Sequence, residues 1–159
     1  MGTIKKAFAG IIAVLVLTVS VAGAALAASS PAVGDTKKAT TGTYVATNVK
    51  SGYASYKKVK KTSVKNDNIS KNVTINGKTY KVNAIANNAY KGVKNLKSIN
   101  VYSKYLTKVG KKAFAGISKA KLAKVKVNVT KKMSAARFNK LKKALIARGF
   151  KAKNIKRNL

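Results

Sequence analysis

The segment Thr107–Ile117 reads TKVGKKAFAGI, and Asn83–Val93 reads NAIANNAYKGV, so one pattern occurs twice with an offset of 107 − 83 = 24 residues. Four pairs of equivalent positions are apolar or aromatic and one pair is glycine: Ile85/Val109, Ala89/Ala113, Tyr90/Phe114, Val93/Ile117 and Gly92/Gly116. Self-similarity at a fixed period of this size is typical of solenoids, in which stacked repeats bury a common core. The sequence therefore predicts two stacked units, at about 83–106 and 107–129.

Each unit continues from its glycine into a predicted strand, at 96–101 in the first unit and at 123–129 in the second. In the second strand, valines alternate with lysine and asparagine in the run AKVKVNV, which is the pattern of a strand with one buried face. Aligning Ile99 with Val125 gives a separation of 125 − 99 = 26 residues. We therefore expect a two-residue insertion in the second unit, around 118–121.

The sequence before the repeats predicts a β-hairpin. Two alternating runs, 73–75 and 78–82, are joined by Asn76-Gly77, and this dipeptide favours a tight turn because both of its positions need positive φ. Short strands are also expected at 44–47 and 54–59. The polar stretch 62–71 is expected to be a connection.

The sequence after the repeats predicts a helix over 134–148. Met133, Phe138, Leu141 and Leu145 fall on one side of this helix, and Gly149 is placed for the left-handed residue that ends it. A final short strand is expected at 154–156. The helix is basic as well as amphipathic, so binding to a membrane surface is an alternative to a role as a cap.

The first 27 residues have the pattern of a signal peptide. Lys5 and Lys6 precede an uncharged apolar run that ends in Ala25-Leu26-Ala27, a small-x-small cleavage site. The run is long enough to serve instead as a retained membrane anchor. In both cases the remainder is exported, and we expect a flexible mature start at 28–43 followed by a single domain at 44–159.

Composition excludes most catalytic chemistry. The chain has no histidine, cysteine or glutamate, and its only acidic residues are Asp35 and Asp67. General acid–base catalysis near neutral pH relies mostly on histidine or a tuned carboxylate, and zinc, copper and iron sites need histidine or cysteine ligands. No enzymatic activity, catalytic residue, metal site or cofactor is predicted.

The net charge predicts an anionic partner. The formal charge is +33, and loss of the two signal-peptide lysines leaves 33 − 2 = +31, more than solubility requires and enough to oppose folding by self-repulsion. Teichoic acid, acidic glycans, anionic lipid headgroups and extracellular nucleic acid are the candidate partners. The outward positions of the two repeat strands form the candidate binding face: Ser98, Asn100, Tyr102, Lys124, Lys126 and Asn128.

Three other interpretations of the charge remain open. The lysines can be a solvated surface with no specific partner, or the strand face can bind a protein. A basic chain also binds nucleic acid non-specifically. However, only three of the 35 basic residues are arginines (Arg137, Arg148 and Arg157), and arginine is the residue favoured for bidentate phosphate and base recognition.

The repeats resemble the BspA-like leucine-rich repeats of bacterial surface proteins. The half-units IANNAYKG (85–92) and VGKKAFAG (109–116) are similar to the family's I-G-x-x-A-F-x-G half, and LKSINV (96–101) is similar to its strand half. Alanine at 86 departs from the usual glycine, and two units are few for this family. The resemblance implies an α+β, mainly β fold, a short leucine-rich-repeat solenoid with an N-terminal β-hairpin cap and a C-terminal helical cap. It implies surface, adhesive or interaction roles, and it gives structural roles to Ile85, Ala89, Tyr90, Gly92, Val109, Ala113, Phe114 and Gly116.

Overall fold

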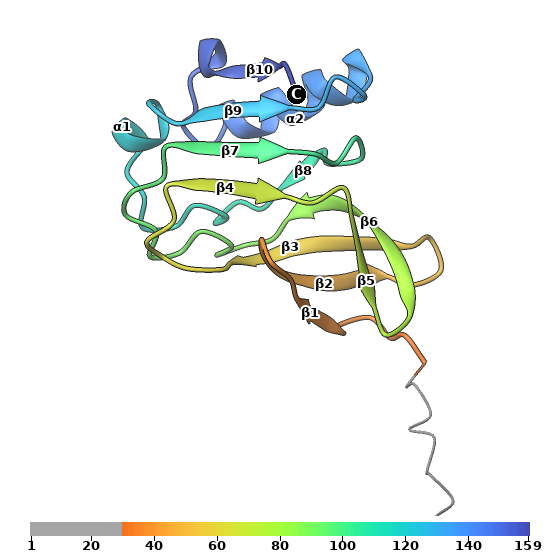
Figure 1. Ribbon diagram of the computed structural model, residues 1–159. Helices are drawn as coiled ribbons and strands as arrows, with labels where there is room; N and C mark the ends of the chain where they lie inside the picture. The colour runs from red at the N-terminus through yellow and green to blue at the C-terminus, as the bar shows by residue number, and fades with distance from the viewer. Residues whose placement is uncertain (1–29) are drawn as a thin grey trace, which may run out of the picture.

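The computed structural model describes residues 30–159, so the signal peptide expected at 1–27 lies outside the described residues. The described chain is mainly β, with two short helices and two sheets (Figure 1). Its elements are β1 Thr36–Lys38, β2 Gly42–Asn48, β3 Tyr53–Val59, β4 Asn66–Ile69, β5 Asn72–Ile75, β6 Lys78–Ile85, β7 Ser98–Val101, β8 Lys108–Val109, α1 Lys119–Leu122, β9 Lys126–Val129, α2 Ala135–Ile146, the 3₁₀ turn η1 Ala152–Asn154 and β10 Ile155–Arg157.

The smaller sheet, which we call sheet B, has four strands in the order β10-β9-β7-β4, and every pair in it is parallel. Figure 1 shows these strands stacked one above another with their N-terminal ends on the same side as α1. In each of the three four-residue strands, alternate side chains are buried, which fits a sheet with one face on the core. These stacked parallel strands are consistent with leucine-rich-repeat-like units.

Equivalent residues of the two repeats lie directly against each other. Ile85 and Val109 are partners in the parallel pairing of β6 with β8. The Tyr90 amide donates to the Ala113 carbonyl at 2.9 Å, and the Tyr90 and Phe114 rings stack with their centroids 4.8 Å apart. The 24-residue repeat in the sequence thus corresponds to two units that stack in the structure.

The insertion in the second unit is larger than the sequence alignment indicated. Ile99 is paired with Val127 rather than with Val125, so the separation is 127 − 99 = 28 residues and the insertion is four residues instead of two. These four residues are accommodated by α1, a single helical turn whose N-cap Ser118 accepts a hydrogen bond from the Lys121 amide. Both alignments keep the valines on one face because strand side chains alternate with a period of two.

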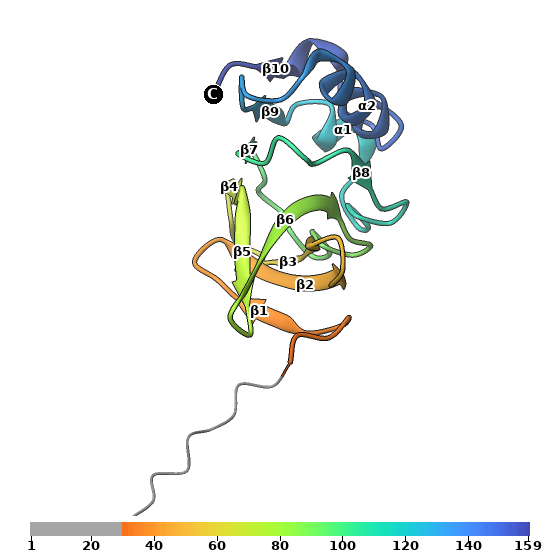
Figure 2. The same cartoon turned by 90° about the vertical axis from the view of Figure 1, so that its right-hand side faces the viewer.

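The predicted N-terminal hairpin cap is only part of a larger structure. The hairpin β5–β6 forms around Asn76 (φ 47°) and Gly77 (φ 74°), but it belongs to a mixed sheet, sheet A, with the order β1-β2-β3-β6-β5 and β8 paired to β6. Figure 2 shows sheet A curling so that β1 approaches β5, as in an incomplete barrel. The curl has a physical reason, since it brings Tyr44, Ala46, Ala54 and Tyr56 inside and covers the open end of the solenoid.

Two further segments differ from the expectations. In place of a flexible start throughout 28–43, Thr36–Lys38 forms β1 and pairs with β2. In place of a polar connection throughout 62–71, Asn66–Ile69 forms β4, the first strand of sheet B. The sequence of β4 looks polar because only Ile69 of its four residues is apolar, and the other inward residue is Asp67. The carboxyl group of Asp67 accepts hydrogen bonds from two tyrosines that are distant in the sequence.

The C-terminal cap combines α2 with β10. Leu141 and Leu145 of α2 are buried, Phe150 packs into the core, and Gly149 has the expected positive φ of 107°. After η1, β10 adds the last parallel strand to sheet B. A continuous row of aromatic rings runs through the core between the two caps, with centroids 4.8–5.8 Å apart, in the order Tyr44, Tyr56, Tyr90, Phe114 and Phe150.

Candidate functional site

A hollow of about 940 Å³ lies where the N-terminal ends of β4, β7 and β9 meet the loops that lead into them. Six lysines, three asparagines, one serine and two aliphatic side chains line it: Lys65, Lys94, Lys97, Lys121, Lys124, Lys126, Asn66, Asn95, Asn128, Ser98, Leu96 and Ile117. We call this the lysine hollow. No acidic residue contributes to its lining, so it presents only positive charge and neutral polar groups.

The parallel register of sheet B creates the polar part of this surface. Asn66, Ser98 and Lys126 are partners across β4, β7 and β9, and the Ser98 hydroxyl donates to Asn66 Oδ1 at 2.9 Å. Because parallel in-register strands place equivalent side chains one above another, each outward position becomes a column across the strands.

The next column along the strands is a row of hydrogen-bonded amides, which we call the amide ladder. Asn100 Nδ2 donates to Asn68 Oδ1 at 2.9 Å, and Asn128 Nδ2 donates to Asn100 Oδ1 at 2.9 Å. Asn158 Nδ2 extends the row by donating to Asn128 Oδ1 at 3.2 Å. The ladder fixes the amide orientations of Asn68, Asn100, Asn128 and Asn158 along the outer face of sheet B.

The structure brings together four of the six residues predicted as the binding face. Ser98, Lys124, Lys126 and Asn128 line the lysine hollow, while Asn100 lies beside it in the amide ladder. Tyr102 follows β7, and 46% of its side chain is exposed, but it does not line the hollow. The predicted structural residues of the repeats are buried, apart from Gly92 (φ 80°) and Gly116 (φ 83°), which sit in exposed turns.

Several residues of this surface were not predicted from the sequence. Asn66 and Asn68 were missed with β4, because NDNI has polar residues at three of its four positions and its alternation appears only in the burial of the folded strand. Lys65, Lys94 and Lys97 lie in loops and Lys121 lies in the single turn α1, and no sequence signal distinguishes these lysines from the others.

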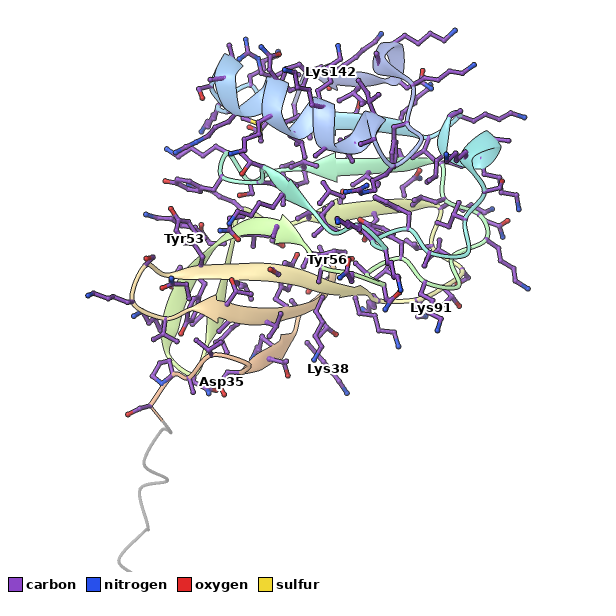
Figure 3. The ribbon with its side chains drawn as sticks, turned by 180° about the vertical axis from the view of Figure 1, so that it is seen from behind. Asp35, Lys38, Tyr53, Tyr56, Lys91 and Lys142 are labelled. Atoms are coloured by element: carbon purple, nitrogen blue, oxygen red, sulfur yellow. The ribbon has the colours of Figure 1, made fainter. Side chains whose placement is uncertain are left out.

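Neither acidic residue lines the hollow. Asp35 Oδ2 accepts from the Ala32 amide at 2.7 Å and from Asn76 Nδ2 at 2.8 Å, next to β1. Asp67 is on the inward side of β4, 3% exposed. Lysines also project elsewhere, as Lys38, Lys91 and Lys142 do in the view from behind (Figure 3). The hollow therefore differs from the remaining basic surface in the number of lysines that line one concave site and not in the sign of its charge.

Asp67 belongs to a buried cluster with two tyrosines. The hydroxyls of Tyr90 and Tyr56 donate to Asp67 Oδ2 at 2.7 and 2.8 Å. Burial raises the pKa of Asp67 above its usual range, and the hydrogen bonds from Tyr90, Tyr56 and the Asn68 backbone oppose that change. Burial, assisted by the nearby carboxylate, also raises the pKa of Tyr56 and of Tyr90. The tyrosines therefore stay protonated and act as donors.

The three arginines are used within the protein. Arg148 Nε donates to the Gly110 carbonyl at 3.1 Å, and Arg157 Nη1 donates to the Met133 carbonyl at 2.9 Å. The Arg137 guanidinium lies 5.2 Å from the centre of the Tyr105 ring. No arginine lines the lysine hollow, so its positive charge comes from lysine side chains alone.

Residues 30–159 contain no cluster of three or more histidine, cysteine, aspartate or glutamate side chains that could hold a metal ion. The two carboxylates, Asp35 and Asp67, make separate sets of hydrogen bonds and share no partner. None of the helices formed by residues 30–159 has the length and apolar content needed to cross a bilayer.

No family model matches the chain, and no curated protein matches it. Among solved structures, it is similar to the crystal structure of a leucine rich cell surface protein from Faecalibacterium prausnitzii A2-165, with a TM-score of 0.46 and 20% sequence identity. The match covers 64% of this chain and 24% of that chain, so this chain spans about a quarter of the length of that protein.

Proposed function

We propose that this chain is an exported, non-enzymatic binding protein of the BspA-like leucine-rich-repeat type, held at the cell surface by anionic polymers such as teichoic acid or acidic glycans. The lysine hollow is the site that we assign to this binding. The observation that carries the proposal is the convergence of six lysines, without an acidic neighbour, on one concave surface. Coulombic attraction of this kind concentrates polyanions and weakens with added salt.

A dedicated nucleic-acid function is a weaker explanation of the same charge. Two arginines donate to backbone carbonyls of the protein itself, and the third lies over Tyr105. The hollow therefore lacks the planar, bidentate donors that recognise guanine edges. Nucleic acid is expected to bind only non-specifically and to be displaced by wall polymer.

The experiment measures retention of the chain lacking residues 1–27 on isolated cell walls, with and without teichoic acid, across a salt series. A hollow variant replaces Lys65, Lys97, Lys124 and Lys126 with glutamine. A control variant makes the same change at Lys37, Lys57, Lys140 and Lys143, which are exposed and do not line the hollow. Both variants lose four positive charges, so their difference reports position rather than total charge.

We expect the hollow variant to lose more affinity than the control, and retention to fall as salt rises. Equal losses in the two variants would mean that charge acts without a site, and retention that ignores salt would contradict the polyanion proposal. Saturable binding to a protein that survives moderate salt and is lost on changing Asn100 and Tyr102 would instead support use of the strand face for protein recognition.

A further inference from the structure

The lysine hollow offers three kinds of contact within one concave surface. Ammonium groups surround it, amide and hydroxyl groups come from Asn66, Asn95, Asn128 and Ser98, and aliphatic surface comes from Leu96 and Ile117, which are only partly buried. A site for a bare polyanion needs only the first kind. The other two kinds call for a ligand that also carries hydroxyl groups and an apolar face.

The amide ladder is arranged so that it can bind further groups. A carboxamide has two N–H donors and an oxygen with two lone pairs. In the ladder, Asn100 and Asn128 each give one N–H to the preceding rung and one lone pair to the following rung. Each rung therefore keeps one donor and one acceptor, at the spacing of about 4.8 Å that separates parallel strands. Because every amide is held by its neighbours, little side-chain freedom is lost when a ligand binds.

We propose that the ligand of the lysine hollow is an acidic glycan, a polymer of uronic acid-like sugars whose carboxylates contact the lysines and whose hydroxyls contact the amide ladder. The assignment rests on the proposed function and narrows it to one class of polymer. A sugar hydroxyl is both donor and acceptor, which matches the free donor and acceptor of each rung. The C–H face of a pyranose ring matches the aliphatic surface of Leu96 and Ile117.

The test compares two carboxylate polymers of matched chain length, polygalacturonate and poly-glutamate, at one salt concentration. Both polymers carry one carboxylate per unit, but only polygalacturonate carries sugar hydroxyls. The wild-type chain is expected to bind polygalacturonate about tenfold more tightly, the effect of one or two additional hydrogen bonds.

The ladder variant changes Asn100→Val and Asn128→Val together, which leaves the charge unaltered and places strand-favouring residues in β7 and β9. It is expected to lose the preference for polygalacturonate, so that its affinity for polygalacturonate falls by more than its affinity for poly-glutamate. Asn139→Ala, at an exposed position of α2, is the matched control and should behave as wild type. Far-ultraviolet circular dichroism and thermal unfolding verify that the ladder variant folds.

The possible outcomes separate the two proposals. If wild type binds both polymers equally and the ladder variant binds like wild type, the glycan assignment is wrong while polyanion binding stands. If neither polymer binds while the chain is still retained on walls that contain teichoic acid, the glycan assignment is wrong and the proposed function stands. If the hollow lysine variant is retained on walls as well as its charge-matched control, the proposed function fails, and the glycan assignment fails with it.

Discussion

The Tyr90 hydroxyl donates a 2.7 Å hydrogen bond to Oδ2 of Asp67, and this bond joins the first repeat to the first strand of sheet B. Its partner is the only buried carboxylate of residues 30–159, and no lysine or arginine is hydrogen-bonded to it. In a protein so rich in cations, the one acid inside the core is held by tyrosines.

The free energy of unfolding should depend on pH through Asp67. Burial raises its pKa in the folded state above the ordinary value of 3.8, so the folded protein binds a proton that the unfolded chain has released. The stabilisation that protonated Asp67 contributes is therefore fully present below about pH 4, and it is lost as pH rises through the pKa of Asp67 in the folded state. Urea unfolding between about pH 4 and pH 7 should show wild type losing stability with rising pH relative to Asp67→Asn. Parallel curves for the two proteins would contradict this prediction.

Two buried tyrosines should respond in opposite ways to loss of the hydroxyl group. Tyr80 is fully buried, and its hydroxyl has no hydrogen-bond partner, so Tyr80→Phe should leave stability unchanged or raise it by about 1 kcal/mol. Tyr90→Phe removes a bond to the Asp67 carboxyl and should cost about 2 kcal/mol. Chemical denaturation of both variants at one pH measures the difference. A larger loss for Tyr80→Phe than for Tyr90→Phe would show that the contacts are misassigned.

Gly110 should tolerate no side chain. A Cβ at this position would lie 2.5 Å from Asn87 Oδ1 and 2.7 Å from the Asn87 backbone nitrogen, so the stacked repeats would have to separate. Gly110→Ala is expected to cost about 2 kcal/mol or more. Gly116 is the matched control, because its Cβ would meet open space and only its φ of 83° is unfavourable. Asparagine tolerates positive φ better than alanine, so Gly116→Asn should lower the melting temperature less than Gly116→Ala does. At position 110 the obstacle is space, so Gly110→Asn should lower the melting temperature at least as much as Gly110→Ala does.

Phe114 should contribute more to stability than Phe150. Phe114 contacts two rings, Tyr90 at 4.8 Å and Phe150 at 4.9 Å between centroids, while Phe150 ends the aromatic row. Leucine at either position keeps most of the apolar volume but loses the ring contacts, each worth roughly 1 kcal/mol. We expect Phe114→Leu to destabilise the protein by about 1 kcal/mol more than Phe150→Leu in urea unfolding. A larger loss of stability for Phe150→Leu than for Phe114→Leu would contradict this prediction.

The sequence predicted the features that depend on local chemistry. The Asn76-Gly77 turn, the helix later found as α2, and the stacking of the two repeats follow from positive φ, helical period and repeat period. It did not predict β4, because strand patterns are recognised by inward apolar residues and one of the two inward positions here is Asp67. The tyrosines that make Asp67 acceptable lie 11 and 23 residues away, so no local window contains them.

The residues of the candidate site likewise fall into those that the sequence predicted and those that it did not. Ser98, Lys126 and Asn128 were found because alternation in a strand assigns each residue to a face. Lys65 and Lys94 join them from loops and Lys121 joins them from the single turn α1, and none of these positions belongs to a periodic pattern in the sequence. The pairing of Ile99 with Val127 could not be predicted from the sequence either, because a shift of two residues leaves the same side chains on the same face of the strand.

The parallel pairing of sheet B has a consequence for the time that the chain takes to fold. Its ladder bonds join residues 32, 28 and 30 positions apart, so no strand of this sheet can form from neighbouring residues alone. Pairings of this kind fold slowly and leave strand edges unpaired during the delay. A chain that waits in this state is exposed to aggregation, and strong like charge keeps such chains apart in solution. The excess of lysine is thus already useful before the protein has folded.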